Sequence, residues 1–127
     1  MKQPISKLMT RDPHTIGRDQ NMLVAHELMR KHHIRHLPVL EGGKLVGVVS
    51  LGDLHLVETL AEVDPAKVRV EEAMSAEPYT VAPDTPIGDV AAEMAEHRYG
   101  CAIVVDEHKV IGVFTTVDAL RALVGRR

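Results

Sequence analysis

One short polar motif occurs twice in this chain, and its residue types and spacing could do chemistry. In each copy a hydroxyl residue ends an apolar run and an aspartate follows three positions later, as Ser50 with Asp53 and as Thr115 with Asp118. At the start of a helix this pattern forms a capping box, in which the hydroxyl accepts a backbone N–H and the acid favours the positive end of the helix dipole. Capping alone is the first interpretation, because such matches are common.

A ligand site is the second interpretation, because the motif recurs in register and each copy follows a short apolar strand. Strand ends that open into helix N-termini are where α/β folds bind ligands, and N–H groups there attract anions. A carboxylate would repel a phosphate, so the aspartate should meet neutral hydroxyls instead. A ribose diol beside the aspartate and a phosphate beside the hydroxyl residue together describe an adenosine-type nucleotide.

The motif belongs to a longer internal repeat. Residues 5–57 align without a gap with residues 70–122 at a constant offset of 65, and eleven aligned positions are identical. Similarity at one fixed offset usually marks one supersecondary unit per copy. Two copies therefore suggest a pseudo-twofold pair that packs as one module, rather than a solenoid.

Each copy is predicted to fold as β-α-β-β-α. The strands are expected at 15–16, 37–40 and 45–50 in the first copy, and at 80–81, 101–105 and 110–115 in the second. The helices are expected at about 21–31, 51–61, 86–96 and 116–124, with Pro86 in a first helical turn. The sequence thus predicts an α/β (α+β) fold with repeats at 4–61 and 70–124, joined by a linker at 62–69.

Composition limits the classes of function. The 127 residues carry a formal net charge of −3 and only 2% aromatic residues, so nucleic acid is disfavoured as a partner. The N-terminal residues lack the apolar core of a signal peptide, and the longest wholly apolar run, 101–105, is too short to cross a bilayer. Cys101 is the only cysteine, so no intrachain disulfide can form. We therefore expect a cytoplasmic protein with no membrane partner.

The two halves resemble cystathionine-β-synthase-type (CBS) domains, and the whole chain is similar to one CBS pair, or Bateman module. The matching residues are the G-x-x-[ST]-x-x-D signatures that begin at Gly47 and Gly112, the Met-Thr and Met-Ser starts at Met9 and Met74, and the segment 34–39 (IRHLPV). The resemblance covers about residues 4–124, and the order and duplication of the motifs carry it.

The resemblance implies that adenosine ligands bind in two clefts between the halves: AMP, ADP, ATP or, in some members, S-adenosylmethionine or NAD. It also implies that the acid of one repeat faces the strand pocket of the other. One implied site combines Thr15, Ile34, Arg35, His36, Pro38, Thr115 and Asp118. The other combines Thr80, Tyr99, Gly100, Cys101, Ala102, Ser50 and Asp53.

The two implied sites are unequal. Arg35 and His36 are replaced at the aligned positions by Gly100 and Cys101, although Arg98 is near in sequence. The second site therefore lacks a cation equivalent to Arg35, and we expect the first site to bind phosphate better.

Other kinds of chemistry are weaker alternatives. His32, His33 and His36 cluster, but no cysteine or acid completes a recognisable zinc spacing, so a polar helix end is favoured over a metal site. Cys101 follows His97 by four residues inside an apolar run, which is typical of a buried, inert thiol rather than a nucleophile. No acid–base–nucleophile constellation supports an enzyme, and no cofactor is expected to be required.

Two functions follow from these interpretations. The first is a regulatory sensor, in which an adenine nucleotide shifts the packing of the halves and an effector protein or self-association responds. The resemblance implies a homodimer formed through the helices. The second is a structural dimerisation module with vestigial ligand sites, in which the two motifs only cap helices. The sequence leaves the adenosyl ligand and the effector open.

Overall fold

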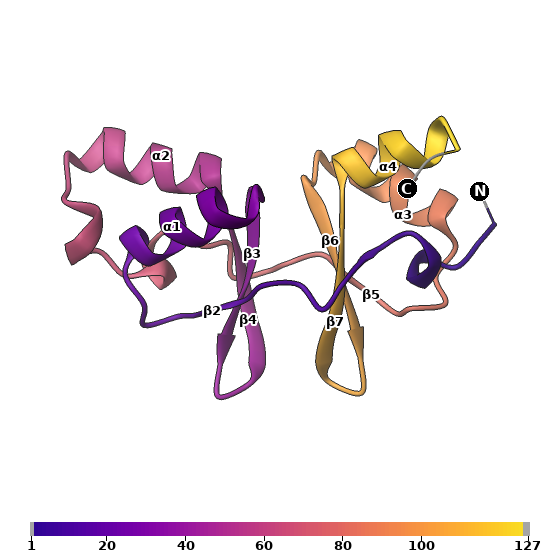
Figure 1. Ribbon diagram of the computed structural model, residues 1–127, viewed down its shortest axis with the longest axis horizontal. Helices are drawn as coiled ribbons and strands as arrows, with labels where there is room; N and C mark the ends of the chain where they lie inside the picture. Colours follow the sequence, from indigo (N-terminus) through magenta and orange to yellow (C-terminus); the bar gives the residue numbers. More distant parts are fainter. Residues whose placement is uncertain (1, 126–127) are drawn as a thin grey trace. The chain divides into compact units, whose positions relative to one another are not determined.

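The computed structural model describes residues 2–125, with Ala61 described by its backbone alone. These residues form two compact units. The central unit comprises residues 14–78, and the terminal unit comprises the described residues up to Pro13 together with those from Tyr79 onward. Each unit carries one small sheet and two α-helices (Figure 1).

The central unit has a three-stranded sheet in the order β2-β3-β4. Strand β2 (Ile16–Gly17) runs parallel to β3 (His36–Glu41), and β3 pairs with β4 (Lys44–Ser50) as an antiparallel hairpin. Helix α1 (Met22–His32) connects β2 to β3, because a parallel pair needs such a crossover, and α2 (Leu51–Ala61) follows β4 directly. Two short 3-10 helices complete the unit, η2 (Pro65–Lys67) and η3 (Val70–Glu72).

The core of the central unit lies between α1, α2 and the sheet. Met22, Ala25 and Met29 are buried along one face of α1, at the spacing of an amphipathic helix, and belong to one cluster with Leu37 of the sheet. The predicted linker at 62–69 joins this cluster, because Val68 is buried in it and accepts the Met22 N–H at 2.8 Å.

The terminal unit has the same plan with one strand more, in the sheet order β1-β7-β6-β5. Strand β5 (Thr80–Val81) is parallel to β6 (Cys101–Asp106), and β6 pairs antiparallel with β7 (Lys109–Thr115). The helices are η1 (Ile5–Lys7), α3 (Ile87–His97) and α4 (Thr116–Leu123). Its buried cluster consists of Ile5, Met9, Ile87, Val90, Met94, Ala102, Val104 and Phe114.

The predicted α/β fold is confirmed, and each predicted helix and strand lies within one residue of its predicted ends. Two details differ. Pro86 occupies the N-cap position rather than the first turn, with an extended ψ of 138°, and Ile87 begins α3. Strand β1 (Thr10–Arg11) was not predicted, because a two-residue polar strand has no periodicity of its own.

The segment that begins each repeat, called its lead-in below, pairs with a strand of the other repeat. Thr10 and Arg11, which begin the first repeat, pair with Val113 and Gly112 of β7 in the second. The matching lead-in of the second repeat pairs with the first, where Val48 and Ser75 exchange hydrogen bonds of 3.0 and 2.9 Å. The compact units therefore do not coincide with the consecutive repeats of the sequence.

The exchanged lead-ins explain why methionine and glycine recur together in both repeats. A Cβ built on Gly47 would lie 2.6 Å from Met74 Sδ and 2.6 Å from the Ser75 carbonyl oxygen. A Cβ on Gly112 would likewise fall on Met9 Sδ. Only glycine lets each methionine and its backbone approach the strand this closely.

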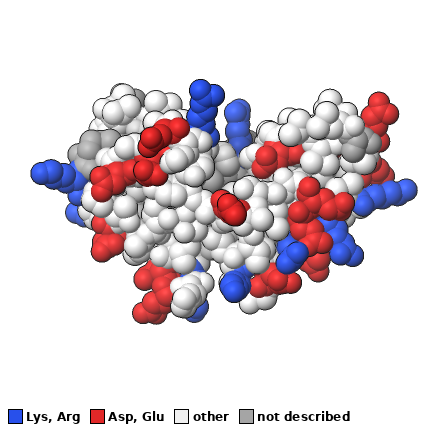
Figure 2. Space-filling model, turned by 180° about the vertical axis from the view of Figure 1, so that it is seen from behind, with Lys and Arg blue, Asp and Glu red and all other residues white. Residues whose placement is uncertain are grey.

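None of the described helices is long and apolar enough to cross a membrane. On the face drawn in Figure 2, Lys and Arg side chains are interspersed with Asp and Glu side chains and with uncharged surface. The described residues on that face therefore form no continuous basic patch.

Candidate functional site

Both hydroxyl–aspartate motifs are capping boxes. The Ser50 N–H donates to Asp53 Oδ2 at 2.9 Å, and the Asp53 N–H donates to Ser50 Oγ at 3.0 Å. In the terminal unit the Thr115 N–H donates to Asp118 Oδ2 at 2.9 Å, and the Asp118 N–H donates to Thr115 Oγ1 at 3.3 Å. The capping interpretation is therefore confirmed for both copies, and it leaves the ligand hypothesis open.

The central unit brings the site residues of the first repeat to one end of its sheet. His36 lies opposite Ser50 in the β3–β4 register, and the Arg35 carbonyl accepts the Leu51 N–H at 2.9 Å. Thr15 immediately precedes β2, and Ile16 of β2 lies opposite Val39 in the parallel strand β3. Thr15 therefore lies near the buried Pro38, the residue before Val39. Strand pairing thus places the predicted phosphate-binding cation, Arg35, beside the capping box.

The terminal unit gathers the matching residues of the second repeat in the same way. Cys101 lies opposite Thr115 in β6–β7, and the Gly100 carbonyl accepts the Thr116 N–H at 3.2 Å. Cys101 and Ala102 are buried, as an inert thiol in an apolar strand would be, whereas Thr80 is exposed. Thr80 itself lies opposite Ile103.

The exposed Tyr99 belongs to a stack of rings in the terminal unit. Its ring centroid lies 5.1 Å from that of Tyr79 and 5.2 Å from that of His97. Offset ring pairs at such distances are favourable, so the stack helps to hold the Tyr99 ring in place just before β6. Ile34, its counterpart in the central unit, is half-buried.

The combination of each acid with the strand residues of the other repeat stays a prediction. Within each unit the structure joins the strand residues to the acid of the same repeat, as with His36 and Asp53. The implied pairs of Arg35 with Asp118, and of Gly100 with Asp53, join residues of different units.

The pKa of His36 is displaced from its ordinary value. Burial in the sheet lowers the pKa of His36 below 6.5, the nearby Asp53 carboxylate opposes that effect, and Arg35 adds to it. The folded state therefore favours neutral imidazole, which can still accept or donate one hydrogen bond. A phosphate bound beside it would favour the protonated form.

Lowering the pH is expected to reduce the stability of the chain through His36. Because the folded pKa lies below the unfolded value of 6.5, the unfolded state binds more protons in the interval between them. The stability that neutral His36 retains above pH 6.5 is thus lost as the pH falls through the folded pKa, with a slope of at most about 1.4 kcal/mol per pH unit for one proton.

Urea unfolding between about pH 5 and pH 8 measures this loss. His36→Gln should flatten the pH dependence relative to the wild-type chain. His32 contributes in the same direction, because partial burial and the neighbouring His14 lower its pKa, so the difference between variant and wild type carries the prediction. An unchanged slope in His36→Gln would contradict it.

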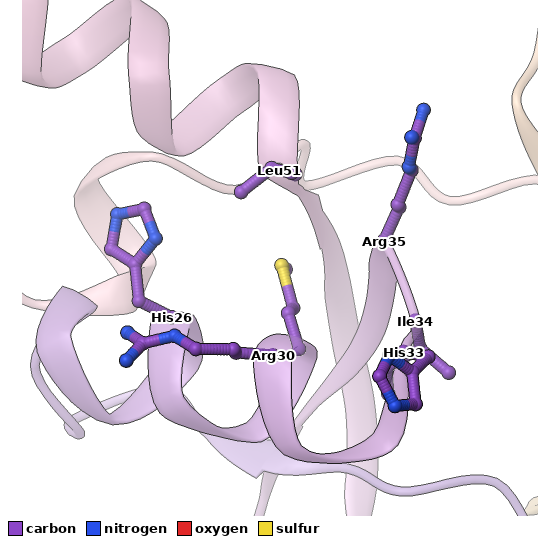
Figure 3. A pocket seen from close by; sticks show the side chains of 7 residues that line it. His26, Arg30, His33, Ile34, Arg35 and Leu51 are labelled. Carbon is purple, nitrogen blue, oxygen red and sulfur yellow. The ribbon is translucent and has the colours of Figure 1, made fainter.

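A pocket opens in the same place in each repeat. In the central unit a pocket of about 450 Å³ lies between α1 and the start of α2 and includes His26, Arg30, His33 and Arg35 in its lining (Figure 3). In the terminal unit a pocket of about 380 Å³ lies between α3 and the start of α4. Each central lining residue has its counterpart, 65 positions later, in the terminal pocket.

Three basic residues that line the central pocket were not predicted as site residues from the sequence. His26, Arg30 and His33 follow one another at spacings of four and three, so they share one face of α1 and its end. That spacing was the available signal. The interpretation of the His32–His33 segment as a polar helix end left it unused.

One group of side chains in the described part of the chain could share a metal ion. Glu93, Glu96 and His97 place one ligand atom each within 4.8 Å of one another near the end of α3, and all three are exposed. Glu93 and His97 already form an ion pair at 3.3 Å. Exposed carboxylates one helical turn from a histidine are common without a metal, so the arrangement is accounted for by the ion pair.

Comparisons with known proteins agree with this architecture. The family model of the CBS domain matches this chain twice, at residues 5–57 and at residues 70–125. The CBS domain pair of protein MJ0100, solved in complex with 5-methylthioadenosine and S-adenosyl-L-methionine, is 25% identical, with a TM-score of 0.87 and 100% of both chains covered. The structure of CBSX2 in complex with AMP is 26% identical, with a TM-score of 0.81 and 97% of each chain covered.

A curated relative carries the same segment inside a longer protein. L-aspartate semialdehyde sulfurtransferase of Methanocaldococcus jannaschii is 31% identical over 132 residues, which cover 100% of this chain. The chain spans 25% of the length of that enzyme. The family match fills both repeats and the structures of CBS pairs share the fold, so the chain belongs to the CBS domain family, as a pair of CBS repeats.

Proposed function

We propose that this CBS pair is a regulatory module that binds an adenosine-containing ligand and transmits the bound state to an effector protein or to a second copy of the chain. The candidates are AMP, ADP, ATP, S-adenosylmethionine and NAD. The observation that carries the proposal is the duplicated capping box, placed by strand pairing beside Arg35 and His36 in the central unit. The bound AMP and S-adenosyl-L-methionine of two similar structures support the adenosine class.

Asp53 can cap its helix and contact a ligand at the same time. One of its carboxylate oxygens accepts the Ser50 N–H, and the other can accept a ribose hydroxyl, because a carboxylate offers about four lone-pair positions. Arg35 is exposed beside it and can donate to a phosphate in bidentate geometry. The acid and the cation thus suit different parts of a nucleotide, the ribose and the phosphate.

Removing Asp53 tests the ribose contact. Asp53→Ala should lower the free energy of unfolding by about 1 kcal/mol through the lost cap. It should also reduce the thermal stabilisation by AMP or S-adenosylmethionine, each measured against the variant's own ligand-free midpoint. Asp53→Asn is the matched control for capping, because its amide oxygen can still accept the Ser50 N–H.

The expected result for Asp53→Asn is a ligand-free midpoint close to wild type with a reduced ligand-induced shift. If both variants keep the full shift, Asp53 does not bind the ribose. If none of the five candidates at millimolar concentration stabilises the wild-type chain, the sensor hypothesis fails. A ligand at one hundred times its Kd should stabilise by about 2.7 kcal/mol, which is well within reach of the measurement.

Structural dimerisation is the second candidate function, and exposed apolar side chains favour it. Leu56 and Leu60 on α2 are 57% and 75% exposed. Leu120 and Leu123 on α4 are 57% and 70% exposed, and Val117 lies three positions before Leu120. Leucines this exposed at helical spacing are typical of a helix that packs against a partner.

Changing the α4 leucines tests the dimer. The double variant Leu120→Glu, Leu123→Glu should run as a monomer in light scattering, because two charges on the apolar stripe oppose its burial. Lys44→Glu, on the exposed hairpin of the central unit, should leave the mass unchanged. If the wild-type chain is already monomeric at about 100 μM, a concentration above the dissociation constants of ordinary dimers, dimerisation through α4 is excluded.

A further inference from the structure

The chain passes between its two compact units at two points, and a similar residue follows each point. The central unit begins at His14, directly after Pro13, and the terminal unit resumes at Tyr79, directly after Pro78. His14 and Tyr79 occupy aligned positions of the two repeats. In both repeats, therefore, the residue at which the chain enters a unit carries a ring and follows a proline.

Each of these rings stacks on another ring of the unit that the chain enters. The His14 ring stacks on that of His32, the last residue of α1, with centroids 3.5 Å apart and planes inclined by 14°. Tyr79 stacks at 5.1 Å on Tyr99. Tyr99 in turn stacks at 5.2 Å on His97, the counterpart of His32. Stacking is favourable between neutral rings, so each stack stabilises the entry of the chain into its unit.

The entry into the terminal unit also has a backbone hydrogen bond that the central unit cannot form. The Tyr79 carbonyl accepts the Ile103 N–H at 2.9 Å. The residue aligned with Ile103 is Pro38, which has no N–H to donate to His14. The stack of His14 on His32 therefore carries more of the attachment at the entry into the central unit.

Protons weaken the central stack, because the charges around it are basic. Partial burial lowers the pKa of His32, and the neighbouring basic residues lower it further: His14, Lys31 and His33. No ion pair from a carboxylate to His14 or His32 is found within the described residues. Two protonated rings stacked in this way would repel each other, so protonation favours the opening of the stack.

The terminal stack keeps its attraction when the pH falls. Partial burial and the nearby Glu93 and Asp89 raise the pKa of Tyr79 above 10, so its ring stays neutral. A protonated His97 would face the Tyr99 ring and also Glu93, its ion-pair partner at 3.3 Å, and both attract a cation. Of the two stacks, therefore, only the central one is weakened by protons.

We propose that the stacked rings of His14 and His32 form a pH-sensitive latch, which holds the entry of the chain into the central unit when the rings are neutral and releases it when they bind protons. The segment that opens is β2, since it begins two residues after His14 and pairs with β3 through two residues. Because the closed latch lowers the pKa of His32 below 6.5, the open state binds more protons between these values. The opening constant therefore rises as the pH falls, by at most about tenfold per pH unit for one proton.

Amide hydrogen exchange on the full chain measures this opening. The Arg18 N–H reports on β2, because it donates to the Leu40 carbonyl of β3 at 2.9 Å. The Val48 N–H, which donates to the Ser75 carbonyl at 3.0 Å in the same unit, is the control for general loosening. From about pH 7.5 to about pH 5.5 the protection factor of Arg18 should fall by about threefold or more, and by more than that of Val48.

His14→Tyr is the decisive variant, because it places the aligned residue of the second repeat at an exposed position and can still stack on His32. It should remove most of the pH dependence of Arg18 protection. It should also raise the NMR titration midpoint of the His32 ring towards 6.5. His33→Asn is the matched control, since it removes a neighbouring charge, leaves the stack in place and suits the left-handed backbone there, with φ of 55°.

His33→Asn should keep the pH dependence of the wild-type chain. The proposal is overturned if Arg18 protection falls no more than Val48 protection in the wild-type chain, or if it falls as steeply in His14→Tyr. An unchanged titration midpoint of His32 in His14→Tyr would also overturn it, because the two rings would then not be coupled. These measurements use no ligand, so their outcome does not depend on whether the chain binds a nucleotide.

Discussion

Replacing Gly47 with alanine is expected to lower the free energy of unfolding by about 1–3 kcal/mol, the usual cost of forcing atoms into a packed site. The new Cβ would lie 2.6 Å from Met74 Sδ and 2.6 Å from the Ser75 carbonyl oxygen. The sulfur can move, but the carbonyl is fixed because Ser75 O accepts the Val48 N–H at 3.0 Å. Urea unfolding measures the loss.

Gly52→Ala is the control for the general effect of replacing glycine. Its Cβ would meet only Ser50 Oγ, at 3.7 Å, and Gly52 lies within α2, so alanine there should stabilise by about 0.5–1 kcal/mol. A Gly47→Ala variant as stable as Gly52→Ala would contradict the close approach of the lead-in to β4.

Gly112 separates the side-chain part of this cost from the backbone part. The nearest atoms to a Cβ there belong to the Met9 side chain, and the nearest carbonyl, that of Thr10, is 3.1 Å away. Met9→Ala lowers the free energy of unfolding by itself, because it leaves a cavity. In its presence, Gly112→Ala should cause only a small further loss, because the clash with the Met9 side chain is gone. Met74→Ala should relieve only part of the cost of Gly47→Ala, and double-mutant cycles measure the difference.

Replacing Arg35 with alanine is expected to weaken AMP binding by roughly 1.5–3 kcal/mol, or about tenfold or more, if Arg35 holds the phosphate. Arg35 is exposed and its carbonyl, rather than its side chain, holds the start of α2. The variant should therefore fold with nearly wild-type stability. Calorimetric titration of AMP checks the loss of affinity.

Adenosine is the matched control ligand for Arg35→Ala, because it has the ribose and base of AMP and no phosphate. Its affinity should stay within about twofold of wild type, a difference of about 0.4 kcal/mol. An equal loss for adenosine and AMP would show that the substitution damages the site rather than a phosphate contact. Unchanged AMP affinity would remove Arg35 from the phosphate site.

Features that depend on neighbouring residues could be predicted from the sequence. The 3.6-residue period located the helices, and short apolar runs between turn residues located the strands. The spacing of Ser50 and Asp53 located a helix start that the structure confirms as a capping box. The fixed offset of 65 also gave the duplication, which the family match to both halves bears out. These features follow from local geometry, which a sequence states directly.

The candidate site could be predicted only residue by residue. Arg35, His36 and Ser50 were identified separately, and the β3–β4 register is what makes them neighbours. The displaced pKa of His36 also depends on burial, which arises when the sheet is covered. Register and burial are properties of pairs of segments, so no single segment reveals them.

The sequence by itself thus determined the elements, the repeat and the helix caps, because each depends on residues a few positions apart. Only the tertiary structure decided which lead-in completes which sheet, since Met9 and Met74 find their glycines across long stretches of chain. It also decided that Arg30 and Arg35, on a helix and after it, line one pocket. Contacts between distant segments are selected by the packing of the whole core, and their pattern is absent from any local spacing.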